Sequence, residues 1–294
     1  MKPIIKWVGG KTQILDKVLE SFPREMENYH ELFVGGGSVL FGILESKDIT
    51  VKGKVHAYDK NQKLINMYRQ IQENPKDVHD HLTELFKIYD TLTGTEVNRK
   101  PQTEEEGLTS KESYYYWVRK TYNDLIPTTY THAATLIFLN KTCFRGVYRE
   151  GPNGFNVPYG HYKTTPLVVS LEELVKIQDL VKNVVFKCCD FRDAFTQTVN
   201  DDDFIYADPP YAPESVKSFV GYTKDGFGID DHTDLFNLLK SSRIDFVMSN
   251  AKVDLVTNNF KDYKIDDVPA RRAIHSKDPS STTMEVLVHG YVRK

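Results

Sequence analysis

The chain has 294 residues, 40% of them hydrophobic, and a formal net charge of −3. This length can bury one large domain or two, and the charge excludes wholesale attraction to a polyanion but not a local basic patch. No run approaches the roughly 20 apolar residues of a membrane span, and the start MKPIIKWVGGK lacks a signal-peptide layout. Three cysteines make no disulfide framework, so a soluble protein of the reducing cytoplasm is expected.

The first part of the chain alternates between strand and helix patterns. Residues 29–34 predict a strand that ends at Gly35-Gly36-Gly37, and a helix pattern follows. Residues 54–59 predict a second strand, which leads into a helix over about 61–72. These elements predict the beginning of an α/β sheet.

The middle of the chain has a different character. Residues 77–139 are mostly helical in pattern, interrupted at 93–110 by a polar stretch that we expect to be a mobile surface loop. Residues 142–162 carry Gly, Pro, Asn and aromatic residues at a spacing typical of a hairpin or an irregular loop. The middle therefore predicts a mainly helical insertion with a β-hairpin.

After Pro166 the alternation resumes. We expect helices at 170–181, 231–241 and 252–260, and strands at 183–189, 203–207, 244–249, 262–268 and 284–292. Strands that alternate with helices favour a parallel sheet covered on both faces. The predicted fold is a doubly wound, mostly parallel, seven-stranded α/β sheet, formed by residues 1–69 and 166–294 and interrupted by an inserted domain at 70–165.

A first group of residues indicates a nucleoside cofactor. Ligands of a doubly wound sheet bind at the carboxyl ends of its strands, where Gly35-Gly36-Gly37 and Asp59 stand. The glycines alone fit a plain turn equally well, but an acid at the end of the next strand commonly binds ribose hydroxyls. GGKTQ is not a P-loop, and Lys11 suits a carboxylate as well as a phosphate. S-Adenosylmethionine has both a ribose, which suits Asp59, and a carboxylate, which suits Lys11. Trp7 is either part of that site or a core residue.

A second group, DFIYADPPYAP, indicates chemistry on an amino group. Prolines cannot continue a sheet, so the strand must end at Asp208. The Asp208 carboxylate and the Pro209 carbonyl supply two acceptors for the two N–H groups of a nucleobase amine, and Pro210 stiffens the turn. Tyr211 offers a face on which the base can stack. This arrangement stabilises the charge that develops on nitrogen during methyl transfer, and a base in a duplex must be flipped out to reach it.

Four motifs in order resemble the Dam-type, alpha-group (D12 class) DNA adenine-N6 methyltransferases: KWVGGK (6–11), ELFVGGG (31–37), FNVPYG (155–160) and DPPY (208–211). The resemblance implies a Rossmann-like methyltransferase domain. It also implies S-adenosylmethionine contacts from Trp7, Lys11, Phe33, Gly35, Gly36, Gly37, Asp59, Asp190, Phe191 and Asp208. Leu32 departs from the proline common in relatives, which changes local stiffness.

The segment 140–163 concentrates cations and aromatic residues, which suits DNA binding as well as an ordinary surface loop. By resemblance, Phe144 intercalates, Arg149 reads a base, and Val147 and Pro158 make apolar base contacts. Lys6, Lys141, Arg145, Asn156 and His161 complete the DNA-binding set that this resemblance implies. Relatives often have asparagine at Arg145 and arginine at His161, so the target is GATC or a variant such as CATG. The polar loop 270–283, with Arg271, Arg272, His275 and Lys277, either closes over DNA or is a solvated connection.

The leading hypothesis is a DNA adenine-N6 methyltransferase that uses S-adenosylmethionine and duplex DNA, with a cognate restriction endonuclease as a conceivable partner and no metal. Cytosine-N4 methylation obeys the same chemistry, although such enzymes more often have serine in place of Asp208. A catalytically silent DNA-binding relative and an RNA substrate stay open. Methylation at cytosine C5 needs a thiol nucleophile, and no cysteine here follows a proline.

Overall fold

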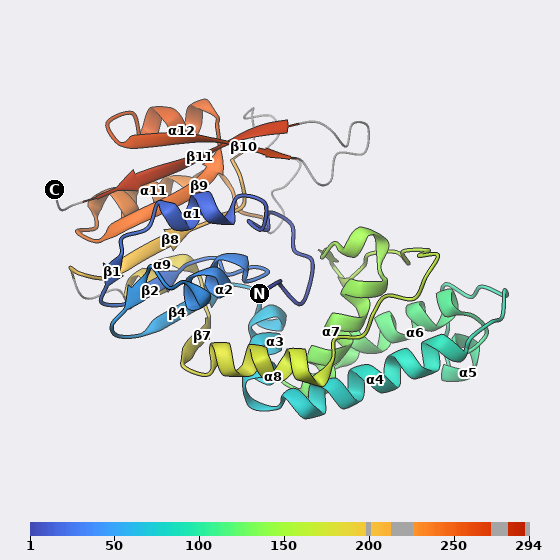
Figure 1. Cartoon of the computed structure of the whole chain (residues 1–294). Coiled ribbons are helices and arrows are strands. Elements are labelled where there is room, and N and C mark those ends of the chain that lie inside the picture. The colour runs from blue at the N-terminus through green and yellow to red at the C-terminus, as the bar shows by residue number, and fades with distance from the viewer. Residues whose placement is uncertain (198–200, 213–225, 272–281, 292–294) are drawn as a thin grey trace. The chain divides into compact units, whose positions relative to one another are not determined.

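The computed structural model describes residues 1–197, 201–212, 226–271 and 282–291 (Figure 1). The chain divides into two compact units. One, which we call the sheet unit, comprises Met1, Lys11–Lys60 and Asn183–Lys294, and the other, the helical unit, comprises Lys2–Gly10 and Asn61–Lys182. Besides the short N-terminal stretch Lys2–Gly10, the divisions fall after residues 60 and 182, whereas the sequence placed them after 69 and 165.

The sheet unit contains a mixed, mainly parallel sheet of seven strands in the order β10-β11-β9-β8-β2-β4-β7. Neighbours from β9 to β7 are parallel, while β11 runs antiparallel to both β9 and β10. The bounds are β2 Tyr29–Glu31, β4 Val55–Asp59, β7 Val184–Cys188, β8 Phe204–Ala207, β9 Asp245–Ala251, β10 Lys264–Arg271 and β11 Thr282–Gly290. The predicted α/β class and the mostly parallel sheet are confirmed.

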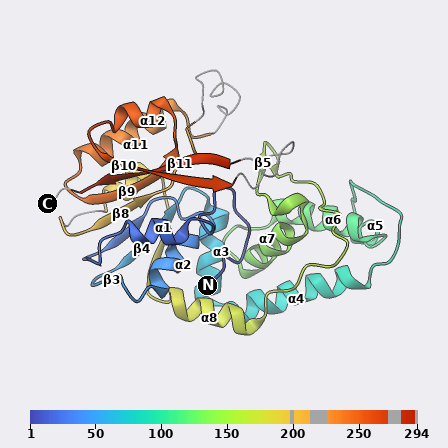
Figure 2. The ribbon, with the colours of Figure 1, turned by 45° about the horizontal axis from the view of Figure 1, so that its top comes forward.

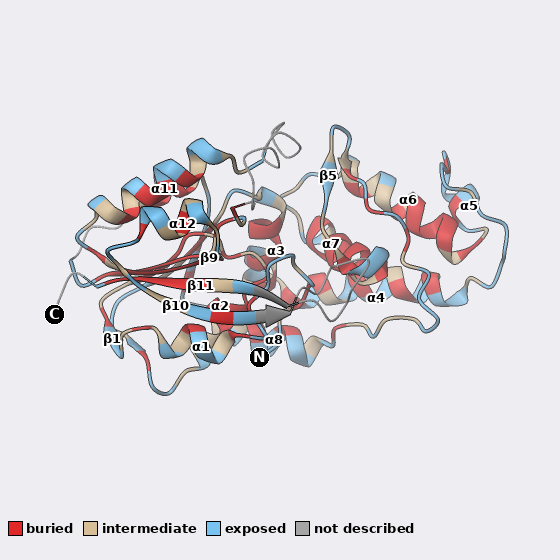
Figure 3. Cartoon of the chain, turned by 90° about the horizontal axis from the view of Figure 1, so that it is seen from above, coloured by how far each residue is buried: buried red, intermediate tan, exposed pale blue. Residues whose placement is uncertain are grey.

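Helices cover both faces of this sheet, which Figure 3 shows with α1 and α2 on one side and α11 and α12 on the other. The bounds are α1 Leu15–Glu20, α2 Ser38–Glu45, α9 Phe191–Phe195, α11 Ile229–Ser241 and α12 Asp254–Asn259. Because side chains alternate along a strand, Phe204 and Tyr206 of β8 pack with α1 and α2, whereas Ile205 and Ala207 pack with α11 and α12. The two apolar clusters explain the run of buried residues in β8.

Strand β2 is shorter than predicted, because regular pairing stops before Leu32. Two hydrogen bonds still continue the ladder, from Leu32 N to Tyr206 O at 3.0 Å and from Val34 N to Tyr58 O at 2.8 Å. The sequence did not predict α1 or the two-residue parallel pair of β1 Glu25–Met26 with β3 Thr50–Val51.

The helical unit is built around a buried helix, α7, with α3, α4 and α6 beside it (Figure 2). Its elements are α3 Gln62–Glu73, α4 Pro75–Thr91, α5 Glu104–Gly107, α6 Lys111–Asp124, α7 Tyr130–Thr142, the 3₁₀ turn Phe144–Gly146, β5 Glu150–Gly151, β6 Gly154–Phe155 and α8 Leu171–Val181. Since α7 is surrounded, ten of its residues are buried on all sides. The predicted hairpin is present as the antiparallel pair β5 and β6.

The stretch 93–110, expected to be a mobile surface loop, lies mostly exposed at the surface, as predicted. The stretch contains α5, and polar side chains fix its backbone: Asn98 N donates to Ser113 Oγ at 2.8 Å, and Thr109 Oγ1 donates to Glu96 O at 3.0 Å. The polar residues that suggested solvent exposure act as hydrogen-bond partners inside the stretch. In the described part of the chain, no helix is long and apolar enough to cross a membrane.

Candidate active site

Asp208 lies directly after β8, and two side chains hold its carboxylate. Lys11 Nζ is 2.6 Å from Asp208 Oδ2, and Ser249 Oγ donates to Asp208 Oδ1 at 2.7 Å. The Lys11 side chain is 3% exposed and that of Asp208 is 17% exposed, so the pair is largely desolvated but the carboxylate keeps an open side. The Asp208 carboxylate thus has a cationic partner and a hydroxyl donor, which make short, charge-assisted hydrogen bonds.

A buried relay of hydroxyl groups supports Asp208 from behind. Tyr206 OH lies 3.0 Å from Ser249 Oγ, and both residues are fully buried. Because Ser249 has one hydrogen and directs it to the carboxylate, Tyr206 must donate to Ser249. Burial raises the pKa of Tyr206 well above its ordinary value, which keeps this phenol protonated. Sequence reasoning missed Ser249, although its place near the carboxyl end of β9 was a usable signal.

The remaining residues of the DPPY turn (208–211) are fixed from both ends. Asn250 Oδ1 accepts from Ala212 N at 3.0 Å, and His232 Nε2 lies 3.1 Å from the Pro210 carbonyl oxygen. Lys11 Nζ also lies over the Tyr211 ring, 4.9 Å from its centroid. No hydrogen bond to the Pro209 carbonyl is recorded from the residues that the structure describes, so this oxygen is an acceptor without a protein donor there.

The predicted cofactor residues of the sheet unit meet at the same edge. Gly35 N donates to Asp59 Oδ2 at 3.1 Å, which joins the ends of β2 and β4. Gly35 and Gly37 have φ of 48° and 76°, a conformation that other residues adopt only at a cost. Asp190 follows β7 and caps α9 by accepting from Arg192 N at 3.1 Å.

Aromatic side chains lie beside these acids. The rings of Phe33, Phe191 and Phe227 form a triangle with centroid distances of 5.8, 5.6 and 5.5 Å. Arg192 holds Asp190 in place and bridges it to Asp231 and Asp234 of α11, with contacts of 3.1, 2.8 and 2.6 Å. Carboxylates and aromatic rings are thus gathered at the carboxyl ends of β2, β4 and β7.

Two of the motif residues, Lys6 and Trp7, belong to the helical unit. Trp7 stacks on Tyr148 with ring centroids 4.8 Å apart, and it is half-buried. Asn140 clamps this segment: its Oδ1 accepts from Lys6 N, and its Nδ2 donates to the carbonyls of Lys6 and Gly146. Asn140 was not among the predicted residues, and nothing in its helical sequence context marks this role.

The predicted recognition segment presents an exposed aromatic ring. Phe144 is 46% exposed, and the Arg145 guanidinium lies over its ring at 5.2 Å. Phe144 N donates to Pro158 O at 2.8 Å, and Cys143 pairs with Tyr159, so the two arms of the segment lie side by side. Arg145 has φ of 58°, in the left-handed region that favours Asn or Gly.

The other predicted DNA residues vary in exposure. Arg149 donates to Asn156 Oδ1 at 2.7 Å and to the Asn156 carbonyl at 3.2 Å, so the two residues hold each other at the surface. Burial lowers the pKa of Lys141. The exposed members are Lys6, Arg149, Asn156, Pro158 and His161, and the half-buried ones are Lys141 and Val147. Arg272, His275 and Lys277 lie outside the described residues, as does the side chain of Arg271.

Two of the three thiols, those of Cys143 and Cys189, do not suit nucleophilic chemistry. Burial raises the pKa of Cys143 to about 12 and that of Cys189 to about 11, so both are protonated at neutral pH. Among the described side chains, no group of three or more His, Cys, Asp or Glu could hold a metal ion.

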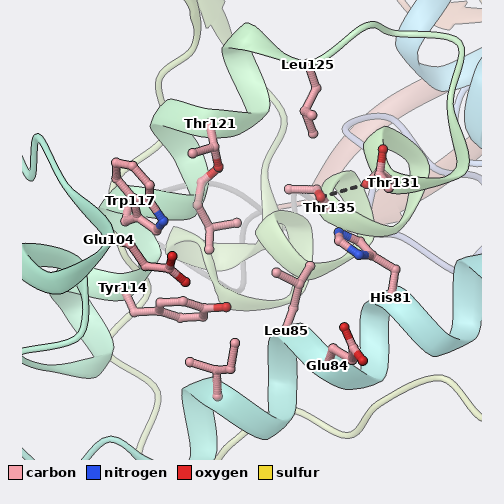
Figure 4. A pocket seen from close by; sticks show the side chains of 12 residues that line it. His81, Glu84, Leu85, Glu104, Tyr114, Trp117, Thr121, Leu125, Thr131 and Thr135 are labelled. Carbon is pink, nitrogen blue, oxygen red and sulfur yellow. Dashed lines mark hydrogen bonds between the residues drawn. The ribbon is translucent and has the colours of Figure 1, made fainter.

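A separate pocket of about 320 Å³ lies in the helical unit (Figure 4). Side chains of α4, α5, α6 and α7 line it, including Glu84, Glu104, Tyr114 and Trp117. None of the predicted DNA or cofactor residues is among them, so this pocket is distinct from the surfaces described above.

Comparison with known proteins decides the family. The pattern of the D12 class N6 adenine-specific DNA methyltransferases matches residues 7–274. The chain belongs to that family. It is 34% identical over 292 residues to the type II methyltransferase M.MjaIII of Methanocaldococcus jannaschii, covering 94% of each chain. It is 30% identical to M1.LlaDCHI of Lactococcus lactis, covering 99% of this chain and 96% of the relative. The DNA adenine methylase of Haemophilus influenzae is 27% identical over 293 residues, covering 98% and 92%.

Membership of the D12 class makes this protein a DNA adenine-N6 methyltransferase. The resemblance inferred from the four motifs is confirmed, and adenine is favoured over the cytosine-N4 alternative. The family establishes the reaction at the amino group of adenine in DNA.

Proposed function

We propose that this methyltransferase flips adenine out of a short palindromic duplex site and methylates its N6 with S-adenosylmethionine, using residues 208–211. The observation that carries the proposal is the held carboxylate of Asp208, joined to Lys11 at 2.6 Å and to Ser249 at 2.7 Å. It stands at the edge of the sheet where the strand-end acids Asp59 and Asp190 also stand.

The chemistry of the neighbouring side chains fits S-adenosylmethionine. Asp59 suits ribose hydroxyl groups, Asp190 suits the adenine amine, and Phe33 with Phe191 suits the purine ring. Gly35 and Gly37 have positive φ, and because they lack side chains they leave the backbone of this turn uncovered. A hydrogen bond from Gly35 N joins the turn to Asp59. Lys11 is engaged with Asp208, so we assign it to the catalytic carboxylate as well as to the predicted cofactor contact. When bound, the cofactor supplies an electrophilic sulfonium methyl group.

The protein's own part in the reaction is to prepare the adenine amine. The lone pair of this nitrogen is delocalised into the purine ring, so the amine is a poor nucleophile. Asp208 and the Pro209 carbonyl accept hydrogen bonds from its two N–H groups and favour a pyramidal nitrogen. As the new N–C bond forms and the S–C bond breaks, the carboxylate stabilises the charge on nitrogen. The methylated nitrogen then loses one proton to Asp208 or to water.

The segment 140–163 supplies the DNA contacts through its exposed side chains. Phe144 is the candidate for the wedge that enters the gap left by the flipped base, and its 46% exposure leaves the ring available. Arg149, held by Asn156, presents a guanidinium group whose geometry suits a guanine edge in the major groove. The proposed target is a short palindrome with a central A-T, GATC or a variant such as CATG. Lys6, Arg145 and His161 are proposed to contact the backbone or neighbouring bases.

The names of relatives and the completeness of the DPPY turn bear on the biological setting. Several relatives are named type II methyltransferases, which supports a role in restriction and modification beside a cognate endonuclease that reads the same site. A catalytically silent DNA-binding relative is disfavoured, because the carboxylate, both prolines and the tyrosine of the DPPY turn are all present.

The test is to methylate a random duplex library with labelled S-adenosylmethionine and to map modified bases with a readout that separates N6-methyladenine from N4-methylcytosine. We expect N6-methyladenine at one short palindrome and no transfer by Asp208→Ala. Transfer by Asp208→Ala at the wild-type rate would refute the mechanism. Tight binding without methylation of any duplex would support the silent relative, and preference for an RNA substrate would overturn the choice of DNA contacts.

A further inference from the structure

Tyr211, the last residue of the DPPY turn, has a hydrogen-bond partner outside every motif. Its hydroxyl group lies 2.5 Å from Glu285 Oε2. Glu285 stands on β11 opposite Ala251 of β9, and it is half-buried. Burial and the nearby carboxylates raise the pKa of Tyr211 far above its ordinary value, so the phenol keeps its proton and donates to Glu285.

This contact fixes the one part of Tyr211 that the backbone cannot fix. The prolines restrict the main chain before the ring, and Asn250 holds the main chain after it by accepting from Ala212 N at 3.0 Å. Neither restraint sets the rotation of the side chain about its Cα–Cβ and Cβ–Cγ bonds. A hydrogen bond at the far end of the ring does so, because it ties the hydroxyl oxygen to a neighbouring strand.

One face of the Tyr211 ring is already used. Lys11 Nζ lies over the ring at 4.9 Å from its centroid, while the same ammonium group pairs with Asp208. A flipped base that stacks on Tyr211 therefore needs the opposite face, and a small rotation of the ring would misplace the base relative to Asp208. Misplacement on the scale of 1 Å is costly in catalysis.

We propose that Glu285 is a positioning residue for methyl transfer: by accepting the Tyr211 hydroxyl, it sets the plane on which the flipped adenine stacks. The inference rests on the proposed function of the DPPY turn. Glu285 acts through its acceptor oxygen, so a neutral acceptor at the same place should serve. Its effect belongs to the step at the base, and binding of the cofactor should be independent of it.

Four variants separate this role from a purely structural one. Glu285→Ala removes the acceptor, whereas Glu285→Gln keeps an acceptor without charge. Tyr211→Phe keeps the ring without the donor, and the fourth variant combines Glu285→Ala with Tyr211→Phe. The matched control is Asp267→Ala, an exposed carboxylate on the adjacent strand β10 that pairs with Lys252. Each protein is checked for its thermal unfolding midpoint. Single-turnover methyl transfer is measured at saturating duplex and cofactor, together with the Kd of S-adenosylmethionine.

We expect Glu285→Ala and Tyr211→Phe each to lower the single-turnover rate by about tenfold, the scale of one hydrogen bond to a charged group. The double variant should be no slower than either single one, because both changes remove the same bond. Glu285→Gln should stay within about threefold of wild type, and Asp267→Ala and every cofactor Kd should be unchanged. A 2-aminopurine at the target position, quenched when it stacks, should be brighter in Glu285→Ala.

Multiplying effects in the double variant, or a Glu285→Gln rate as low as that of Glu285→Ala, would overturn the positioning role. Wild-type rates in Glu285→Ala would also overturn it. Failure of the proposed function looks different, because the wild-type protein itself would then transfer no methyl group to adenine N6.

Discussion

Lys11 Nζ lies 2.6 Å from Asp208 Oδ2, although 197 positions separate the two residues. Their side chains are 3% and 17% exposed, so the ion pair is removed from most of the solvent. A buried charge is tolerated only when it is paired and hydrogen-bonded. Lys11 therefore serves both the stability of the sheet unit and the charge of the carboxylate that we propose as the acceptor for the adenine amine.

Lys11→Met should test both roles. Removing the cation leaves Asp208 with the Ser249 hydroxyl group alone, and breaking a buried pair typically costs about 3 kcal/mol of unfolding free energy. We expect urea unfolding to show that loss of unfolding free energy. The rate of methyl transfer should fall by at least about 100-fold, because a rise of about 2.7 kcal/mol in the activation free energy has that effect.

The matched control is Lys17→Met, since Lys17 pairs with Glu20 at 3.7 Å but is 69% exposed. Exposed pairs contribute little, so this variant should behave as wild type in both assays. Equal losses in the two variants would show that the buried position of Lys11 is irrelevant.

The sequence predicted the residues at the ends of the parallel strands because their position follows from a local rule. Gly35, Asp59 and Asp208 each stand at the end of a recognisable strand, and the carboxyl ends of parallel strands share one edge of the sheet. Asp190 came from the family resemblance instead. No knowledge of strand order was needed to place Gly35, Asp59 and Asp208 together. The chemistry of Asp208 could therefore be argued from a single stretch of eleven residues.

The partners of these residues required the order and direction of the strands. Ser249 reaches Asp208 only because β9 lies next to β8. Glu285 stands near the start of its strand, where a parallel topology would put it at the opposite edge. Because β11 is antiparallel, Glu285 lies opposite Ala251, at the carboxyl end of β9. Long-range pairing of this kind leaves no local pattern.

In the helical unit, polarity was a limited guide to local structure. The pattern of residues 93–110 predicted a surface loop, and most of the stretch is exposed. Polarity alone did not predict α5 or the hydrogen bonds of Asn98 and Thr109 within the unit. Polar residues that cap and bridge have the same composition as polar residues that face water.

The buried histidine of β2 predicts a loss of stability in acid. His30 Nε2 lies 3.2 Å from Asp203 Oδ2, and His30 Nδ1 lies 3.2 Å from Tyr58 OH. Burial, with help from His56, lowers the pKa of His30 to about 4 from 6.5. The folded state thus prefers neutral histidine, and between pH 6.5 and 4 the unfolded state binds more protons. Stability is full above pH 6.5 and falls as the pH drops through this window, by about 3 kcal/mol.

His30→Gln isolates this contribution, because an amide can donate and accept but does not titrate in the window. Urea unfolding at several pH values should show a steeper acid loss for the wild-type protein than for the variant. Other titrating groups, including His132 with its pKa lowered to about 4 by burial and by Lys63, are common to both proteins. The difference between the two curves therefore reports His30 together with its coupling to His56. Parallel curves would contradict the assignment to His30.

Arg145 is held in a backbone conformation that suits asparagine better. Its φ of 58° lies in the left-handed region, which costs an ordinary residue about 1 kcal/mol and Asn or Gly less. Arg145→Asn should therefore raise the unfolding free energy by about 0.5 kcal/mol. The same change removes a cation beside Phe144, so duplex affinity should fall. If Arg145 contacts a phosphate, the slope of log K against log salt concentration should become shallower by about one unit.

Lys163→Asn is the control for Arg145, because Lys163 is an exposed cation at the end of the same segment without positive φ. It should lower duplex affinity without raising stability. A stability gain in both variants would show that backbone strain at Arg145 is not the cause.

Phe144→Ala should slow methylation of a fully paired duplex, because the proposed wedge would no longer occupy the gap left by the flipped adenine. Unstacking and unpairing cost a few kcal/mol in a paired duplex and less at a mismatch. We therefore expect a rate about tenfold below wild type on the paired site and near wild type when the target adenine faces a mismatch. Tyr130→Ala removes another exposed aromatic ring of the helical unit, 42% exposed against 46% for Phe144, and should leave both rates unchanged. An equal loss on paired and mismatched substrates would assign Phe144 to DNA binding in general, since only a wedge depends on the cost of opening the target pair.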